Sequence, residues 1–153
     1  MSDWKRTTRE VPFEGLMPEL ASAINAHIEL YNLGSILSDF SMCIQTDSEK
    51  AKKGLFGNTE YALQVAVVTS HWLIWAVLNA NTPVVLSAQL SNVTVQDYEQ
   101  TPFAKMVPDS GIQVNGLFTD TSEIASAFIG LDDNAAARKF KEILIKAVQD
   151  AVR

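Results

Sequence analysis

Residues 61–79 read YALQVAVVTSHWLIWAVLN, and this apolar stretch decides the fold. Its valine, isoleucine, threonine and tryptophan side chains favour a pleated strand over a helix. A polar break at 69–71 divides it, so the sequence predicts two antiparallel strands joined by a hairpin turn at the centre of a sheet. The second strand is apolar on both of its faces, so each face of the sheet needs a covering layer.

The composition is typical of one globular domain. The chain has 153 residues, 47% of them hydrophobic and 20% charged, which is enough to bury a core without disulfides. The first ten residues are polar and contain no apolar signal segment. Cys43 is the single cysteine and fits a reducing compartment. These features predict a cytoplasmic protein.

The charge distribution favours a protein partner. The formal net charge is −6, which argues against a broad nucleic-acid surface. Residues 54–130, which hold most of the predicted sheet, contain Lys105 as their one cation against six carboxylates. An acidic sheet is repelled by an anionic membrane, so membrane lipid is disfavoured as a partner.

Two amphipathic helices flank the predicted strands. The first lies within 14–33, follows a flexible polar arm over 1–12, and places Met17, Leu20, Ile24 and Ile28 on one apolar stripe. We predict that this stripe covers the outer surface of the sheet, in the same chain or in a neighbouring copy.

The second helix closes the chain over 132–152. Asp132, Asp133 and Asn134 suit its N-terminal cap. Its stripe includes Phe140, Leu144 and Ala147, which we expect to pack near Leu73 or Trp75.

Further strands are predicted around the hairpin, within a sheet region spanning 38–131. Each is a short segment of alternating or β-branched residues bounded by turn-forming residues. Their expected ranges are 40–46, 84–88, 92–98, 103–107, 112–118 and 123–129.

The segment AVVTSHWLIWAV at 66–77 is similar to the strand–turn–strand of bacterial pleckstrin-homology-like (PH-like) and GRAM-like domains, with Thr69, Leu73 and Ile74 at the pattern positions. The strand at 111–114 and the approach of 128–131 to AAARKFKEILIKAV also resemble this family. The resemblance spans residues 40–152. It implies an α+β, mainly β fold: a seven-stranded antiparallel, partly open barrel closed by the C-terminal helix. The N-terminal amphipathic helix would be an addition.

The resemblance also implies a non-enzymatic binding module that acts mainly through protein contacts. In lipid-binding PH domains, cations between the first two strands contact the headgroup, which would place such a site at Lys50, Lys52 and Lys53. A binder of a lipid headgroup is therefore an alternative. A helix-grip fold that encloses a small apolar ligand is another, since it also ends with a long helix against a sheet.

The residues that could carry catalysis are few. Cys43 and His71 could form a thiolate–imidazolium pair, but a lone strand cysteine is more often a small buried side chain. His27 and His71 lie far apart in the sequence, and no metal-binding or phosphate-binding motif is present. The sequence thus predicts no catalytic residues, no metal site and no cofactor.

Candidate partner-binding residues are aromatic or lie on the first helix. Trp72 and Trp75 take opposite faces of one strand, so one would fill the core and the other could anchor a partner. The apolar stripe of the first helix is the second candidate, through Met17, Leu20 and Ile24. We expect an unknown protein partner, with self-association as a further option.

Overall fold

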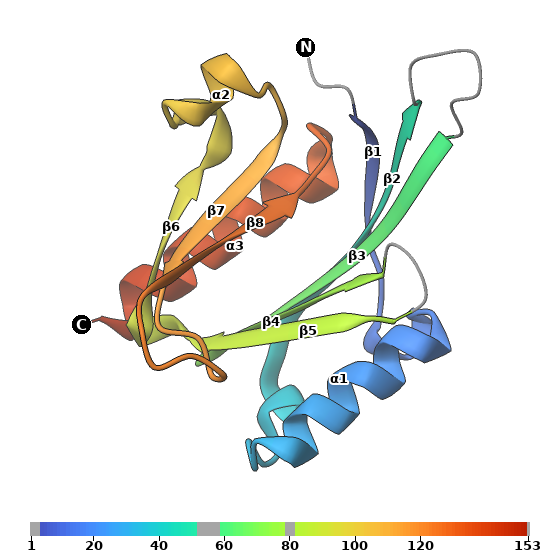
Figure 1. Cartoon of the computed structure of the whole chain (residues 1–153). Helices are drawn as coiled ribbons and strands as arrows, with labels where there is room; N and C mark the ends of the chain where they lie inside the picture. The colour runs from blue at the N-terminus through green and yellow to red at the C-terminus, as the bar shows by residue number, and fades with distance from the viewer. Residues whose placement is uncertain (1–3, 52–58, 79–81, 153) are drawn as a thin grey trace.

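Two antiparallel sheets and three α-helices form the described part of the chain, which comprises residues 4–51, 59–78 and 82–152 of this computed structural model (Figure 1). The strands are β1 (Trp4–Glu10), β2 (Phe40–Ala51), β3 (Thr59–Thr69), β4 (Trp72–Leu78), β5 (Val84–Gln89), β6 (Val93–Asp97), β7 (Gly111–Gly116) and β8 (Ala125–Gly130). The α-helices are α1 (Pro18–Leu30), α2 (Phe103–Met106) and α3 (Ala135–Ala151). The fold is therefore α+β, as predicted.

The predicted hairpin is confirmed. β3 and β4 are the third and fourth strands of a five-stranded sheet with the order β1-β2-β3-β4-β5. Thr69 stabilises the turn, because its Oγ1 accepts hydrogen bonds from the backbone N–H of Trp72 at 3.0 Å and of His71 at 3.3 Å. A side-chain acceptor of this kind replaces the Asn-Gly turn that the sequence lacks.

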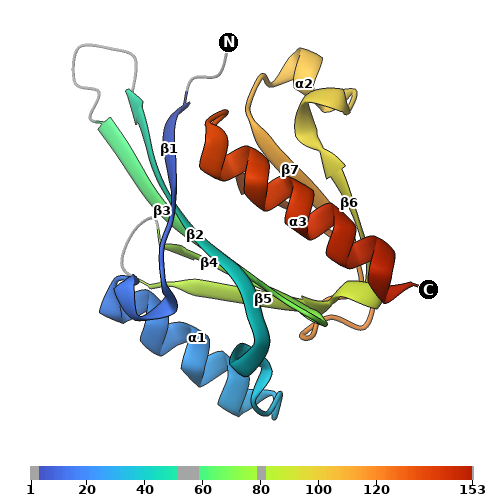
Figure 2. The same ribbon diagram turned by 180° about the vertical axis from the view of Figure 1, so that it is seen from behind.

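Each face of the five-stranded sheet has its own cover (Figures 1 and 2). One face packs against α3 and the three-stranded sheet, whose order is β6-β7-β8. Phe140 and Leu144 are fully buried there beside Leu73 and Trp75, and Ala147 packs at the border of the same core. This arrangement confirms the predicted position of the C-terminal helix.

The other face is covered by α1 from the same chain. Leu20 and Ile24 are fully buried against strand residues, and Ile28 packs beside them. Met17 was predicted to join them, but its side chain is 41% exposed. Met17 is the N-cap residue of α1, with a non-helical backbone, so its side chain falls outside the stripe.

The N-terminal segment differs from the prediction. Residues 4–10 are not part of a flexible arm but form β1, paired with β2 from Trp4↔Lys50 to Glu10↔Ile44. The segment carries four charged residues besides Trp4, so its composition resembles a solvated arm. Contacts between Arg6 and residues far along the chain hold β1 in the sheet.

The predicted strand at 103–107 is also wrong. Pro102 has an αR backbone and the N–H of Val107 donates to Phe103 O at 2.8 Å, so the segment forms the one-turn helix α2. Proline is well suited to a helix start, which explains the difference. The described strands therefore number eight, with β1 as the additional one, and they form two sheets and no closed barrel.

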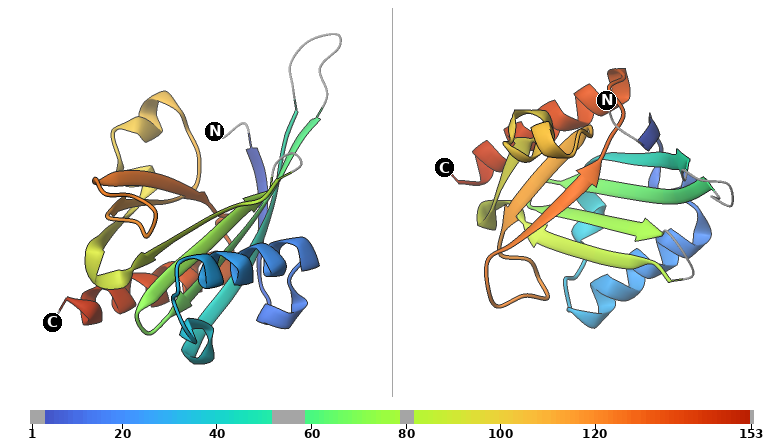
Figure 3. Two further views of the ribbon diagram at one scale, coloured as in Figure 1. Left: turned by 60° about the horizontal axis from the view of Figure 1, so that its bottom comes forward. Right: turned by 45° about the horizontal axis from the view of Figure 1, so that its top comes forward.

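The two sheets meet near the connection from β5 to β6 and diverge toward the end of the molecule where β1 begins (Figures 1 and 3). Leu90, Val93 and Phe118 fill the narrow end. The wide end is lined by polar and aromatic side chains. Within the described ranges, no helix is both long and apolar enough to cross a membrane.

Candidate functional site

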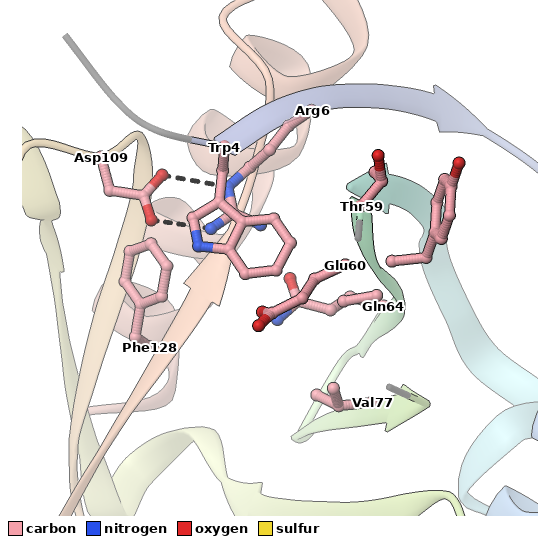
Figure 4. A pocket seen from close by; sticks show the side chains of 10 residues that line it. Trp4, Arg6, Thr59, Glu60, Gln64, Val77, Asp109 and Phe128 are labelled. Carbon is pink, nitrogen blue, oxygen red and sulfur yellow. Dashed lines mark hydrogen bonds and ion pairs between the residues drawn. The ribbon is translucent and has the colours of Figure 1, made fainter. Parts of the chain in front are cut away.

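A cleft of about 620 Å³ lies between the diverging ends of the two sheets (Figure 4). Its side chains come from β1, β3, β4, β8 and the segment before β7. They are Trp4, Arg6, Thr59, Glu60, Tyr61, Ala62, Gln64, Val77, Asp109 and Phe128. The volume is in the usual range for small-molecule and peptide side-chain pockets.

Arg6 and Asp109 form the border of the cleft with a buried ion pair. Arg6 donates from Nε to Asp109 Oδ1 at 3.0 Å and from Nη2 to Oδ2 at 2.7 Å, so the contact is bidentate. Nη1 donates to Ser48 Oγ at 2.7 Å. The two charged side chains are only 7% and 11% exposed. The pair thus joins β1 to the segment that precedes β7 in the second sheet.

The guanidinium of Arg6 also lies near two aromatic rings. Its Cζ is 5.1 Å from the Trp4 ring centroid and 5.6 Å from that of Phe128. Gly130 makes room for this arrangement, because a Cβ atom at that position would lie 2.4 Å from Arg6 Cζ. Glycine at 130 is therefore a steric requirement of the ion pair, and β1 is fixed to β8 as well as to β2.

Thr8 forms a second set of contacts that hold β1 in place, with residues at the start of α3. Its Oγ1 shares a 2.8 Å hydrogen bond with Thr46 and accepts from the backbone N–H of Asp132 at 2.9 Å. Asn134 Nδ2 donates to Thr8 O at 2.7 Å, while its Oδ1 caps α3 by accepting from Ala137 N. Of the predicted capping residues, Asn134 is thus the one whose side chain caps the helix.

The face of the five-stranded sheet opposite α1 changes character along its strands. Cross-strand neighbours are Trp4, Lys50 and Glu60 at the wide end, Thr8, Thr46 and Gln64 further in, and Ile44, Ala66 and Trp75 in the core. The first two rows need polar partners, whereas the third is stabilised by exclusion of water. The cleft occupies the rows that the second sheet leaves uncovered.

Gln64 carries an acceptor that the fold does not use. Its Oε1 is buried and has no hydrogen-bond partner among the described residues. An unpaired buried acceptor costs about 1–3 kcal/mol, and such a group needs an explanation. Gln64 lies in the wall of the cleft beside Glu60 (Figure 4), but Oε1 itself has almost no exposed surface, so a bound molecule reaches it only when the side chain turns.

A buried chain of hydrogen bonds lies on the other face of the sheet. His27 Nε2 is 2.7 Å from Ser87 Oγ, which is 2.6 Å from Thr119 Oγ1. Burial lowers the pKa of His27, with an opposing effect from the charge of Asp120. Ser87 and His27 resemble a nucleophile with its base, but Ser87 is fully buried, so no substrate reaches it. The chain joins α1, β5 and the segment after β7.

Cys43 is equally inaccessible. It is 1% exposed beneath α1, and burial followed by the charge of Glu14 raises its pKa to about 12. His71 lies exposed at the tip of the β3–β4 hairpin. The structure does not bring these two residues together as a nucleophile and base, and a thiol with a raised pKa is a poor nucleophile.

The structure separates the residues predicted to bind partners. Trp75 is buried and packs edge-to-face on Phe118 at 5.3 Å, and Leu20 and Ile24 are buried beneath the sheet, so none of the three offers a free surface. Trp72 is partly exposed beside two smaller hollows of about 330 and 350 Å³. Met17 is exposed at the start of α1.

Of the three lysines predicted to form a headgroup site, Lys50 is the one that lies within the described residues. Lys50 lies near the end of β2 with its Nζ 5.8 Å from the Trp4 ring centroid. Lys52 and Lys53 lie outside the described residues. Among the described residues, no group of three or more histidine, cysteine, aspartate or glutamate side chains could hold a metal ion.

Most of the cleft residues were missed from the sequence. Arg and Thr occur at both odd and even positions of 4–9, so the segment lacks the apolar–polar alternation by which a strand is recognised. Asp109 lies in the segment Pro-Asp-Ser-Gly, which is typical of a turn, and nothing local connects it with Arg6, which lies 103 positions earlier. His27 continues the stripe of Leu20 and Ile24 and could have been assigned to the buried face.

Comparison with known proteins gives no relative. No family model, no curated protein and no solved structure matches this chain.

Proposed function

We propose that this chain is a non-enzymatic binding module of the PH-like type that acts through contacts with a partner protein. The chain order supports the PH-like assignment: four antiparallel strands, β2 to β5, are followed by three, β6 to β8, and then by α3. β1 and α1 are additions to that arrangement. A cytoplasmic location and self-association remain predictions.

The cleft between the sheets is the binding site in this proposal, and its lining is the observation that carries it. A folded protein normally pairs its buried polar groups, yet Gln64 Oε1 is buried and unpaired there. The ring faces of Trp4 and Phe128 provide apolar contact, while Glu60 and Gln64 provide acceptors. Such a mixed surface suits a polypeptide segment better than the apolar ligand of a helix-grip cavity.

The buried position of the candidate nucleophiles supports a role without catalysis. Ser87 is fully buried and Cys43 nearly so, and burial raises the pKa of Cys43. The lipid-headgroup alternative depends on Lys50 together with Lys52 and Lys53. The net charge of −6 weighs against attraction to anionic lipid.

The experiment is selection of binders from a displayed library of random decapeptides, followed by titration of the synthetic peptides against the labelled protein by NMR. We expect the amide signals of cleft residues to shift, and Ala62→Trp to abolish binding by filling the cleft. Thr94→Trp, on an exposed position of β6, is the matched control and should bind as the wild type does. Equal binding by both variants, or no selected peptide, would contradict the proposed site.

A further inference from the structure

The outer edge of β8 carries backbone N–H and C=O groups that could form further hydrogen bonds. Leu131 N donates to Ser110 O at 3.1 Å, and this pair is in register with the β7–β8 ladder. In an antiparallel pair, bonded and non-bonded positions alternate along each strand. Ala127 and Ile129 therefore bond to β7, and the N–H and C=O groups of Ser126 and Phe128 point to the opposite side. Among the described residues, no backbone group bonds to them there.

The other strand edges in the described part of the chain are protected. β1 carries Lys5, Arg9 and Glu10, and charged side chains discourage the addition of another strand. On β5, Ser87 O already accepts from Thr119 N at 2.9 Å. β6 is five residues long and packs against α3. Each of these edges thus has a feature that prevents strand pairing.

β8 has no such protection. Its sequence ASAFIG contains no proline and no charge, and four of its six residues are alanine, serine or glycine, so a second backbone can approach closely. Phe128 places this edge on the border of the cleft. β8 therefore combines free backbone donors and acceptors with an adjoining cavity that can receive side chains.

We propose that the cleft binds an extended segment of a partner protein that adds to β8 as a further strand, with a basic side chain directed toward Glu60 and Gln64. This inference rests on the proposed function and names the ligand class of the same site. Main-chain bonds to Ser126 and Phe128 would supply affinity, and alternate side chains would enter the cleft.

Charge supports a basic segment. Among the described residues, the cleft lining includes the Glu60 carboxylate, whose oxygens can accept several hydrogen bonds, and an Arg6 guanidinium that is bound by Asp109. Gln64 contributes an unpaired acceptor, and the chain has a net charge of −6. A lysine or arginine side chain provides donors and the complementary charge.

The test uses the pair Ser126→Pro and Ser126→Ala with the peptides selected on the wild-type protein. Proline removes the outward N–H of residue 126, which the fold does not use, so the ladder with β7 stays intact. Alanine keeps that N–H and, like proline, loses the hydrogen bond from Ser126 to Asn115. We expect the proline variant to bind about tenfold more weakly, or worse, than the alanine variant. Thermal melting checks that both variants fold.

A second measurement leaves the protein unchanged. Peptides with N-methyl groups at successive backbone positions should lose binding at alternate positions, as a paired strand requires. The selected peptides should be enriched in lysine or arginine. Loss at every position, at none, or a preference for acidic peptides would overturn the proposal.

The outcomes separate the two proposals. Peptides that shift the cleft signals and bind Ser126→Pro as well as Ser126→Ala would overturn strand addition and retain the cleft as the site. Peptides whose binding is insensitive to both Ala62→Trp and Ser126→Pro would overturn both. Dimerisation of the wild-type protein that Ser126→Pro abolishes would identify a second copy as the occupant and overturn the assignment to a partner protein.

Discussion

The two ends of the space between the sheets are stabilised by different means. At the narrow end, Trp75, Phe118 and Phe140 are buried by apolar contact. At the wide end, Arg6 and Asp109 form a bidentate ion pair, and the cleft remains open beside it. Apolar packing holds many side chains in place without fixed partners, whereas the wide end depends on specific polar contacts such as this buried ion pair. The narrow end therefore provides stability, and the wide end has room for a ligand.

The largest expected effect is at the narrow end. Phe140→Ala should lower the free energy of unfolding by about 3–5 kcal/mol, because it removes a fully buried ring and leaves a cavity. Urea denaturation followed by circular dichroism measures the change. Ile145→Ala, on the same helix but 39% exposed, should cost less than about 1 kcal/mol. Similar losses for the two variants would contradict the assigned face of α3.

The ion pair at the wide end should respond differently to single and double substitution. Asp109→Ala should cost about 3 kcal/mol, because it leaves the buried Arg6 guanidinium without its carboxylate. Arg6→Met combined with Asp109→Leu should recover most of that loss, since no unpaired charge remains. Denaturation of both variants makes the comparison.

An exposed pair provides the control for this prediction. Asp133 Oδ1 lies 3.6 Å from Arg138 Nε, and the side chains are 80% exposed for Asp133 and 64% exposed for Arg138. Asp133→Ala should change stability by less than about 1 kcal/mol. If the double variant were as unstable as Asp109→Ala, the loss would come from something other than the unpaired charge.

His27 is a titratable side chain buried between α1 and the sheet, and it should make stability depend on pH. Its pKa is lowered in the folded protein, so the unfolded chain binds the proton more readily. Stability should be independent of this residue above about pH 6.5 and fall as the pH drops below it, by at most about 1.4 kcal/mol per pH unit. The decrease in stability should level off once the pH is below the pKa that His27 has in the folded protein.

Unfolding measured between pH 5 and pH 8 checks this dependence. His27→Gln should be less stable than the wild type at neutral pH, because it loses the hydrogen bond between the imidazole and Ser87. Between pH 6.5 and pH 5, its stability should change less than that of the wild type. The matched variant Asn25→Gln, at an exposed position of the same helix, should retain the wild-type profile. A profile for His27→Gln that parallels the wild type would show that another group is responsible.

The smallest effect is expected at Gln64. Gln64→Leu should raise the free energy of unfolding by about 1 kcal/mol, the lower end of the cost of a buried acceptor that has no partner. The same substitution should weaken peptide binding in the cleft. Gln96→Leu, on an exposed position of β6, is the control and should alter neither property. A large loss of stability in Gln64→Leu would mean that the amide has a structural role.

Much of the fold could be predicted because its signals are local. The stripes of α1 and α3 have the helical period over many residues, and 61–79 has the composition of buried strands. These patterns located both helices and the central hairpin, including the fully buried Phe140. They also placed α1 against the outer surface of the sheet, but they left open whether that sheet belonged to the same chain or to a neighbouring copy.

The candidate site depends on contacts that the sequence does not display. Arg6 and Asp109 are 103 positions apart, and Thr8 and Asn134 are 126 apart, so their pairing arises only when β1 lies along β2 beneath the second sheet. A charged strand without those partners resembles a solvated arm. Periodic apolar residues thus determined the elements and their buried faces. Only the tertiary structure decided which polar residues met, because a buried polar group depends on the particular partner that the fold brings to it.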